Sequence, residues 1–314
     1  MKKHFFTIAL SILICGASFA QQDATSTQYV LNMLTVNPAY AGYKEQPVIM
    51  MHHRSQWVGF KGAPVTQVIS FDMPFSSKDE MAVGGSLIYD KIGPTTQFTL
   101  QTDFSYKFQL TRRSFVSFGL KGGVDLYQAN LTDLDLISQY NGEQDDFFMQ
   151  NPKGLLLPNV GFGGLYYDRK SFIGVSIPRI FRNQLDKKGS DAWQIMEGDQ
   201  QPTVHIMAGK LYKVNRDYDF QPTISIRATE NTPVSVGLYA NLYLRKVLRL
   251  GVFYHYNEIA GGLIQYEYNR RWKFGYSVDV AASRLIKTNL GSHELLVSYV
   301  LTNKRRRIVY PRYF

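Results

Sequence analysis

The chain has 314 residues, a formal net charge of +10 and 45% hydrophobic residues, which is enough for one large folded unit or two ordinary domains. With a single cysteine, it cannot form an internal disulfide. Its basic character suggests nucleic acid as a partner, but the start of the sequence indicates export and argues against that interpretation.

Residues 1–20 have the features of a secretory signal peptide. Two lysines are followed by an apolar run over 5–14 and then by small residues up to Ala20. The run is too short to cross a bilayer as a helix. A lipoprotein site at Cys15 is the weaker alternative, because Ile14 stands where a small residue is needed. Cleavage before Gln21 would leave a chain without cysteine, with 33 basic and 25 acidic residues.

Alternation of apolar and polar residues dominates the rest of the chain. In the stretch FTLQTDFSYKFQL, residues 98–110, apolar side chains recur at every second position, which is typical of a β-strand with unlike faces. No later segment is apolar over the length that a transmembrane helix requires. We predict about fourteen strands, near 48–58, 64–74, 81–91, 95–110, 114–127, 156–168, 171–180, 203–213, 219–228, 233–245, 247–257, 261–269, 272–282 and 292–301.

The connections between these strands fall into two alternating sets. Even-numbered connections are mostly tight and basic, as in 111–113 and 269–271, whereas the odd-numbered ones include long polar loops at 128–155 and 181–201. Short turns on one rim and longer loops on the other are typical of outer-membrane barrels. A soluble β-sandwich, the alternative fold, gives no reason for this sorting. We therefore predict an all-β, transmembrane outer-membrane antiparallel barrel with short periplasmic turns and longer extracellular loops.

In such a barrel the apolar faces meet lipid and the polar faces line the lumen. The predicted luminal charges are Asp103, Lys107, Lys121, Asp125, Arg249, Glu267, Lys273 and Asp279. Tyrosines near strand ends are expected in the interfacial girdles: Tyr89, Tyr166, Tyr167, Tyr254, Tyr256, Tyr266 and Tyr268.

The sequence gives no support for an enzyme. The histidines lack partners at metal-ligand spacing, and adjacent residues of Ser292-His293-Glu294 diverge on a strand, so they cannot form a triad by themselves. The glycine pairs lack the residues of a phosphate-binding loop. We predict no catalytic residue, cofactor or metal. A passive porin for small solutes is the alternative function, because luminal charges of both signs suit either a filled interior or a wet channel.

The segment before the first strand, QYVLNMLTVNPAYAG at 28–42, resembles the entry signature of the PorP/SprF family, barrel proteins of the type IX secretion system of Bacteroidetes. The next segment, HRSQWVGFKGAPVTQVISFDMPF at 53–75, is similar as well, and the resemblance extends to about residue 301. Residues 302–314 depart from it by adding a basic tail. The signature residues are Asn37, Pro38, Ala39, Tyr40, Ala41, Gly42, Arg54, Gln56 and Trp57.

The resemblance implies a non-enzymatic role in export or cell-surface attachment of proteins with a type IX C-terminal sorting domain, in some cases a gliding adhesin. It implies periplasmic ring proteins and a peptidoglycan-binding protein as partners. The expected organisation is a signal peptide at 1–20, the signature segment at 21–46, the barrel at 47–301 and a periplasmic tail at 302–314. The signature segment would plug the lumen or line its inner rim.

Two regions are candidates for partner binding. We expect the loops 128–155 and 181–202 on the outside surface, where they would meet the exported protein or remain simple solvated loops. Basic turns and the tail would contact ring proteins or anionic lipid headgroups. The candidate residues are Asp133, Asp135, Glu143, Asp145, Asp146, Trp193, Lys304, Arg305, Arg306 and Arg307.

Overall fold

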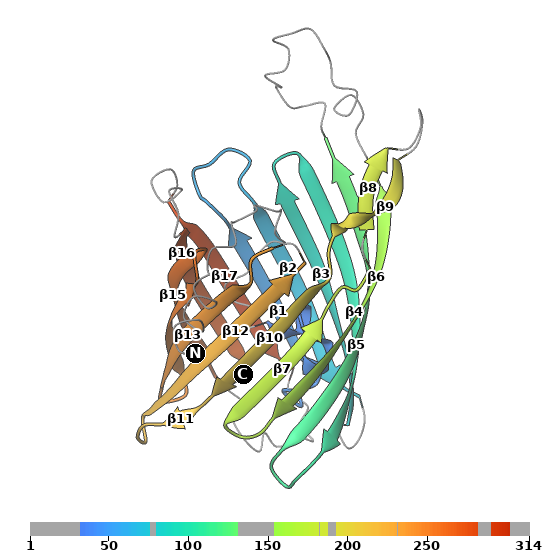
Figure 1. Ribbon diagram of the computed structural model, residues 1–314. Coiled ribbons are helices and arrows are strands. Elements are labelled where there is room, and N and C mark those ends of the chain that lie inside the picture. The colour runs from blue at the N-terminus through green and yellow to red at the C-terminus, as the bar shows by residue number, and fades with distance from the viewer. Residues whose placement is uncertain are drawn as a thin grey trace, which may run out of the picture.

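The computed structural model describes residues 32–75, 80–130, 154–181, 183–187, 193–230, 232–281 and 290–301. Fourteen antiparallel strands form a closed barrel, because β1 pairs with β17 and β10 pairs with β12 (Figure 1). They are β1 (Val48–Ser55), β2 (Val65–Pro74), β3 (Met81–Ile92), β4 (Thr95–Gln109), β5 (Phe115–Ala129), β6 (Leu155–Tyr167), β7 (Ser171–Ile177), β10 (Thr203–Lys210), β12 (Tyr218–Thr229), β13 (Ser235–Leu244), β14 (Leu248–His255), β15 (Ile259–Tyr268), β16 (Trp272–Ala281) and β17 (Ser292–Val300). The predicted fold class is confirmed, and each predicted strand has its counterpart.

The two faces of the wall have the polarity expected in a membrane. On β4, the outward side chains of Phe98, Leu100 and Phe104 are exposed by 41–44%, whereas the inward Gln101 and Asp103 are buried. A soluble sheet would bury its apolar face instead. The alternation therefore places hydrocarbon outside the wall and polar groups inside it.

One rim of the barrel is made of short turns that the sequence stabilises locally. At the β6–β7 turn, Asp168 Oδ1 accepts hydrogen bonds from the backbone N–H groups of Lys170 (2.6 Å) and Ser171 (2.8 Å). Asn215 Oδ1 does the same for Asp217 and Tyr218. Such side-chain turns fix tight hairpins. The longer connection between β1 and β2, residues 56–64, lies on the other rim, at the top of Figure 1.

One long connection contains structure that the sequence did not predict. Strands β8 (Asn183–Lys187) and β9 (Trp193–Gln200) pair as a separate two-stranded sheet within the predicted loop 181–202. Figure 1 shows them above the barrel, on the rim of the longer connections. A second short addition is β11 (Tyr212–Lys213), which continues β10 and pairs with β12.

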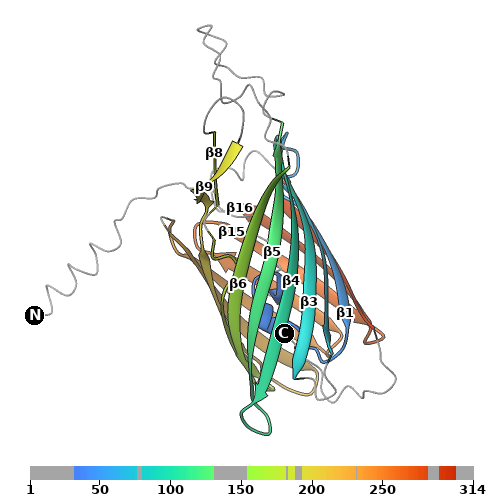
Figure 2. The ribbon, with the colours of Figure 1, turned by 90° about the vertical axis from the view of Figure 1, so that its right-hand side faces the viewer.

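The chain before β1 runs inside the barrel. Residues 32–46, called here the luminal segment, contain two 3-10 helices, η1 (Met33–Thr35) and η2 (Pro38–Tyr40), and lead into β1 at Val48. Their blue ribbon lies within the ring of strands in Figures 1 and 2. No helix in the described ranges is long and apolar enough to span a membrane.

One tyrosine of the predicted girdle faces the wrong way for that role. Tyr167 is 3% exposed and points into the barrel, where its ring stacks on Phe115 at 5.4 Å. Its neighbour Tyr166 points outward and is 37% exposed. Adjacent strand residues point to opposite faces, so the pair cannot serve one girdle together.

Candidate functional site: the filled lumen

Polar side chains of the wall hold the backbone of the luminal segment. The hydrogen bonds to backbone groups are Lys121 Nζ to Leu34 O (3.1 Å), Ser176 Oγ to Val36 O (2.8 Å), Ser105 Oγ to Ala41 O (2.8 Å) and Gly42 N to Asp72 Oδ2 (3.0 Å). They come from β2, β4, β5 and β7. Groups on four strands thus satisfy backbone atoms that burial would otherwise leave unpaired.

Asn37 begins η2 and ties it to the wall at the same time. Its Oδ1 accepts a hydrogen bond from Ala39 N (2.9 Å), as in an N-cap, and its Nδ2 donates to Gly164 O (3.2 Å). Pro38 occupies the first helical position, where its missing N–H costs nothing. The Asn-Pro-Ala sequence therefore both starts η2 and attaches it to the barrel wall.

Glycines on the inner wall make room for this segment. A Cβ at Gly119 would lie 2.3 Å from Ala39 N, and a Cβ at Gly163 would lie 2.2 Å from Asn37 Oδ1. Both distances are far below van der Waals contact. The backbone of η2 therefore packs directly on β5, and the side chain of Asn37 packs directly on β6.

The luminal segment also packs into a buried apolar cluster together with inward side chains of the wall. The rings of Tyr40 and Tyr43 stack at 4.9 Å, and Tyr43 meets Tyr167 edge-on at 4.7 Å. Met33 and Leu34 belong to the same buried cluster. Burial of aromatic rings and of these side chains stabilises the segment against withdrawal.

Charged groups near the end of the segment are matched by wall charges. Lys107 Nζ lies 3.3 Å from Glu45 Oε1. The carboxylates of Asp72 and Glu267 act on the ammonium group of Lys44 as opposite charges. The segment is thus matched to the wall in charge as well as in shape.

A second buried cluster lies nearer the rim of longer connections and joins the first and last strands. Arg54 on β1 contacts Glu294 on β17 and lies 2.7 Å from Asp279 Oδ2 on β16. His52 Nε2 is 3.4 Å from Glu294 Oε2. Arg54, Asp279 and Glu294 are each at most 3% exposed. This ion-pair cluster crosses the β1–β17 seam where the barrel closes.

The structure separates the signature residues into two groups. Residues 37–42 lie in the lumen against β4, β5 and β6, whereas Arg54 is in the seam cluster. Gln56 and Trp57 follow β1 in the first loop, where Gln56 N donates to Pro64 O (2.9 Å) and Trp57 N to Ser292 Oγ (3.5 Å). The motif therefore marks two separate structural positions.

The predicted luminal charges all lie on inward positions of the wall. Five are nearly or fully buried: Asp103, Lys121, Asp125, Arg249 and Asp279. Lys121 pairs with Asp103 at 2.8 Å, and Arg179 lies 3.6 Å from Asp125. Charges of both signs therefore neutralise one another inside the barrel, as mixed luminal charges permit.

The predicted partner-binding residues fall outside the described part of the chain. They are Asp133, Asp135, Glu143, Asp145, Asp146 and Lys304, Arg305, Arg306, Arg307, together with the side chain of Trp193 at the start of β9. Asp72, Gly119 and Gly163, which define the lumen, were missed by sequence reasoning. The available signal was glycine at inward positions of neighbouring strands, which indicates close approach of another backbone.

In the described ranges, no group of three His, Cys, Asp or Glu side chains is arranged to hold a metal ion. The buried carboxylates Asp103, Asp279 and Glu294 each contact a cation of the wall. Such an interior is suited to holding a polypeptide segment in place.

A closed antiparallel barrel with an apolar outer wall and a polar interior defines an integral outer-membrane β-barrel protein. Residues 18–299 match the family described as "Type IX secretion system membrane protein PorP/SprF". The chain belongs to this family, which confirms the resemblance drawn from the sequence, and it is a membrane component of the type IX secretion system. Among curated proteins, no sequence is significantly similar to the chain.

Several solved structures are similar to the chain at low sequence identity. The TodX deltaS2S3 mutant monoaromatic hydrocarbon channel is 9% identical, with 88% of this chain and 94% of that chain covered and a TM-score of 0.48. The KdgM porin in complex with disordered oligogalacturonate is 8% identical, covering 81% and 99%, with a TM-score of 0.38. Outer membrane phospholipase A from Escherichia coli is 10% identical, covering 89% and 99%, with a TM-score of 0.37.

Proposed function

We propose that this protein is a non-enzymatic part of the type IX machine that supports export or cell-surface attachment of proteins with a type IX C-terminal sorting domain. It would act as a filled barrel that anchors partners in the outer membrane, without serving as their conduit. The observation that carries this proposal is the luminal segment, which four strands hold by hydrogen bonds inside the barrel.

The filled lumen argues against the passive porin. A porin needs a continuous water-filled path, but here the buried Tyr40, Tyr43 and Met33 occupy the interior. Reconstitution of the purified protein in planar bilayers tests this point directly. We expect no steady conductance. Stable open channels in the absence of secretion partners would support the porin function and overturn the proposal of a filled, anchoring barrel.

On this proposal, partner recognition belongs to the rims. The short-turn rim exposes basic residues such as Arg112, Arg113 and Arg245, which fit acidic surfaces of periplasmic ring proteins or of a peptidoglycan-binding partner, or anionic headgroups. The loop 128–155, with five acidic residues, is the candidate surface for the exported protein.

Affinity purification from native outer membranes tests the partner assignment. Deletion of 137–150 should abolish surface retention of the exported protein while the heat-modifiable barrel remains, and reversal of the four charges at 304–307 should reduce recovery of ring proteins. Shortening the first loop within 59–63 is a matched control at the same rim as 137–150. Normal retention after deletion of 137–150 would contradict the assignment of that loop.

A further inference from the structure

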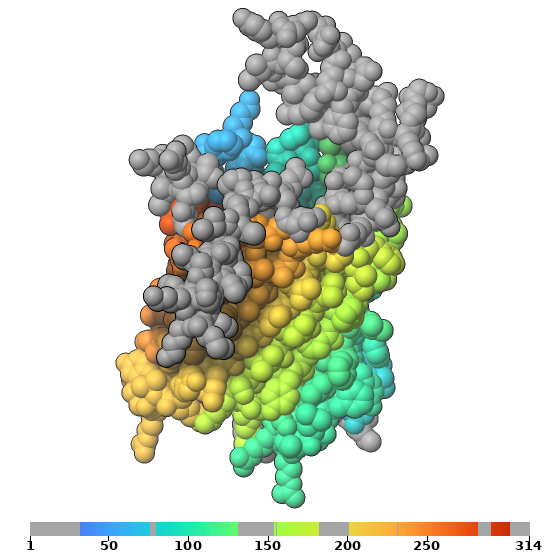
Figure 3. Space-filling view, in the orientation of Figure 1, coloured from blue at the N-terminus to red at the C-terminus, as the bar shows by residue number. Residues whose placement is uncertain are grey.

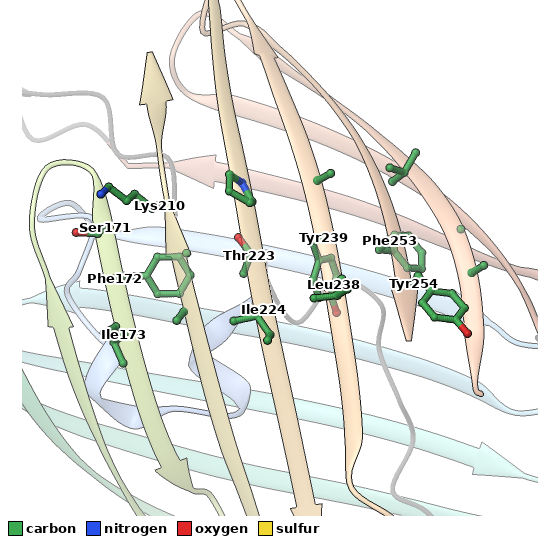
Figure 4. Close-up of a pocket in the computed structure, with 17 residues that line it drawn as sticks. Ser171, Phe172, Ile173, Lys210, Thr223, Ile224, Leu238, Tyr239, Phe253 and Tyr254 are labelled. Carbon is green, nitrogen blue, oxygen red and sulfur yellow. The ribbon is translucent and has the colours of Figure 1, made fainter. Parts of the chain in front are cut away.

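The outer wall of the barrel carries a concave apolar patch that no luminal role explains. It has a volume of about 960 Å³ and extends over β7, β10, β12, β13, β14 and β15 (Figure 4). Two short outward side chains, Pro222 and Ala240, lie side by side in its floor, next to the outward Val252. Long outward side chains border it: Ile173, Ile224, Leu238 and Tyr254, all at least 39% exposed. We call this feature the wall groove.

Strand register explains the shape of the wall groove. Pro222 pairs with Ala240, which places two short side chains next to each other. The next outward row on one side pairs Ile224 with Leu238. The outward row on the other side pairs Phe220 with Leu242. At ~3.3 Å per residue, the two rows of long side chains stand roughly 13 Å apart, which leaves a channel between them of the width of a hydrocarbon chain.

A proline at the floor interrupts the wall itself. Pro222 has no N–H to donate toward β10, and the pairing of β10 with β12 stops at Gly209–Thr223 and resumes only at Tyr212–Phe220 in β11. A proline within a closed barrel loses a ladder hydrogen bond. The short side chain of Pro222 also projects less from the outer surface than the neighbouring rows of long side chains.

One end of the wall groove is basic. Figure 4 shows Lys210 beside Ser171 at one end and Tyr254 toward the other. Lys210 is exposed, and its Nζ lies 5.4 Å from the centre of the Tyr212 ring. Arg169 and Lys170 are exposed on the adjoining turn at the short-turn rim. The same face of the barrel, formed by the strands coloured from green to orange, is seen in Figure 3.

We propose that the wall groove binds one anionic phospholipid, with an acyl chain between the rows of long side chains and the phosphate at Lys210. The apolar floor matches hydrocarbon, and the basic end matches a negative headgroup at the rim, where such contacts form. From β10 to β15 the groove crosses four strand spacings, roughly 19 Å. That length is comparable to one leaflet of the hydrocarbon core, ~15 Å. The site is independent of the export role proposed above.

Native mass spectrometry of the full detergent-solubilised protein with added phosphatidylglycerol or phosphatidylcholine of identical acyl chains tests this site. We expect one phosphatidylglycerol retained more tightly than the others. Lys210→Gln should weaken that lipid about fivefold, which corresponds to ~1 kcal/mol for one cation near a headgroup. Ala240→Leu, which fills the floor, should remove the tight lipid for both headgroups.

Matched control variants keep the test specific. Thr102→Leu adds an outward leucine on β4 away from the wall groove, and Lys61→Gln removes an exposed cation from the first loop on the opposite rim. Both should bind lipid as the unchanged protein does. Equal loss in Ala240→Leu and Thr102→Leu, or equal retention of the two lipids, would overturn the proposal. An oligomer that Ala240→Leu dissociates, with lipid binding unchanged, would identify a second copy as the occupant instead.

Discussion

Gly119 on β5 offers the most direct way to disturb the filled lumen. In Gly119→Ala, the new Cβ would lie 2.3 Å from both Ala39 N and Pro38 C, whereas ordinary contact begins at 3.4 Å. The backbone of η2 must therefore move by about 1 Å, the difference between these two distances. The clash is with backbone atoms, so a side-chain rotation cannot relieve it.

A movement of this size weakens the anchors of the luminal segment. The Ser105–Ala41 hydrogen bond measures 2.8 Å, and about 1 Å more takes it beyond useful hydrogen-bond length. Overpacking of this kind costs ~1–3 kcal/mol. A loss of one to two kcal/mol changes a two-state population by roughly 5- to 30-fold. We therefore expect the fraction of molecules with a displaced luminal segment to rise by about that factor.

Planar-bilayer recording provides the assay. Only protein whose gel mobility changes on heating, as that of a folded barrel does, is used. Gly119→Ala should show intermittent openings and a lower melting temperature, while the unchanged protein stays silent. Gly122→Ala is the matched control on the same strand, because its Cβ meets nothing closer than Thr102 Oγ1 at 3.6 Å. If Gly119→Ala is as silent and as stable as Gly122→Ala, the packing of the segment against β5 does not control closure.

Two further substitutions test the seam and a turn. Arg54→Met leaves Glu294 buried without its cation and should cost ~3–5 kcal/mol in urea unfolding, with partial recovery in the double variant Arg54→Met/Glu294→Gln; unchanged stability would refute the seam's role. Burial opposes ionisation of Asp168, but hydrogen bonds from Lys170 and Ser171 outweigh it and lower its pKa. The ionised form therefore stabilises the fold above the unfolded pKa of ~3.9, and this stabilisation is lost as pH falls through the folded pKa. Asp168→Asn should be less stable than the unchanged protein at pH 7 and should approach it near pH 3; a difference independent of pH would contradict this reasoning.

The wall of the barrel could be predicted because its physics is periodic. Alternation on β4 and β16 needs only side-chain polarity, and Asp168 or Asn215 marks where a tight turn begins. The girdle prediction was wrong for Tyr167, because adjacent strand residues point to opposite faces and Tyr166 occupies the outward position. Strands β8 and β9 also escaped it, since they pair only with each other.

The interior could not be predicted in the same way, because it depends on contacts between distant parts of the sequence. Asn37 donates to Gly164, which lies 127 residues later, and Arg54 meets Glu294 across 240 residues. Before the fold is known, Glu294 is simply an acidic residue beside His293. Gly119 on β5 and Gly163 on β6 leave the space in which Ala39 and Asn37 of the segment pack inside the lumen.

The burial of the signature has a consequence for where recognition takes place. Asn37, Ala39, Tyr40 and Ala41 are 1–5% exposed inside the barrel, and Arg54 is 3% exposed at the seam. Side chains so enclosed reach no partner while the lumen stays filled. These buried signature residues therefore keep the barrel filled and sealed, and on the proposed function discrimination among exported proteins would fall to the rims. Exchange of rim loops between two family members should then transfer partner choice, whereas exchange of the luminal segments should alter closure and stability and leave partner choice unchanged.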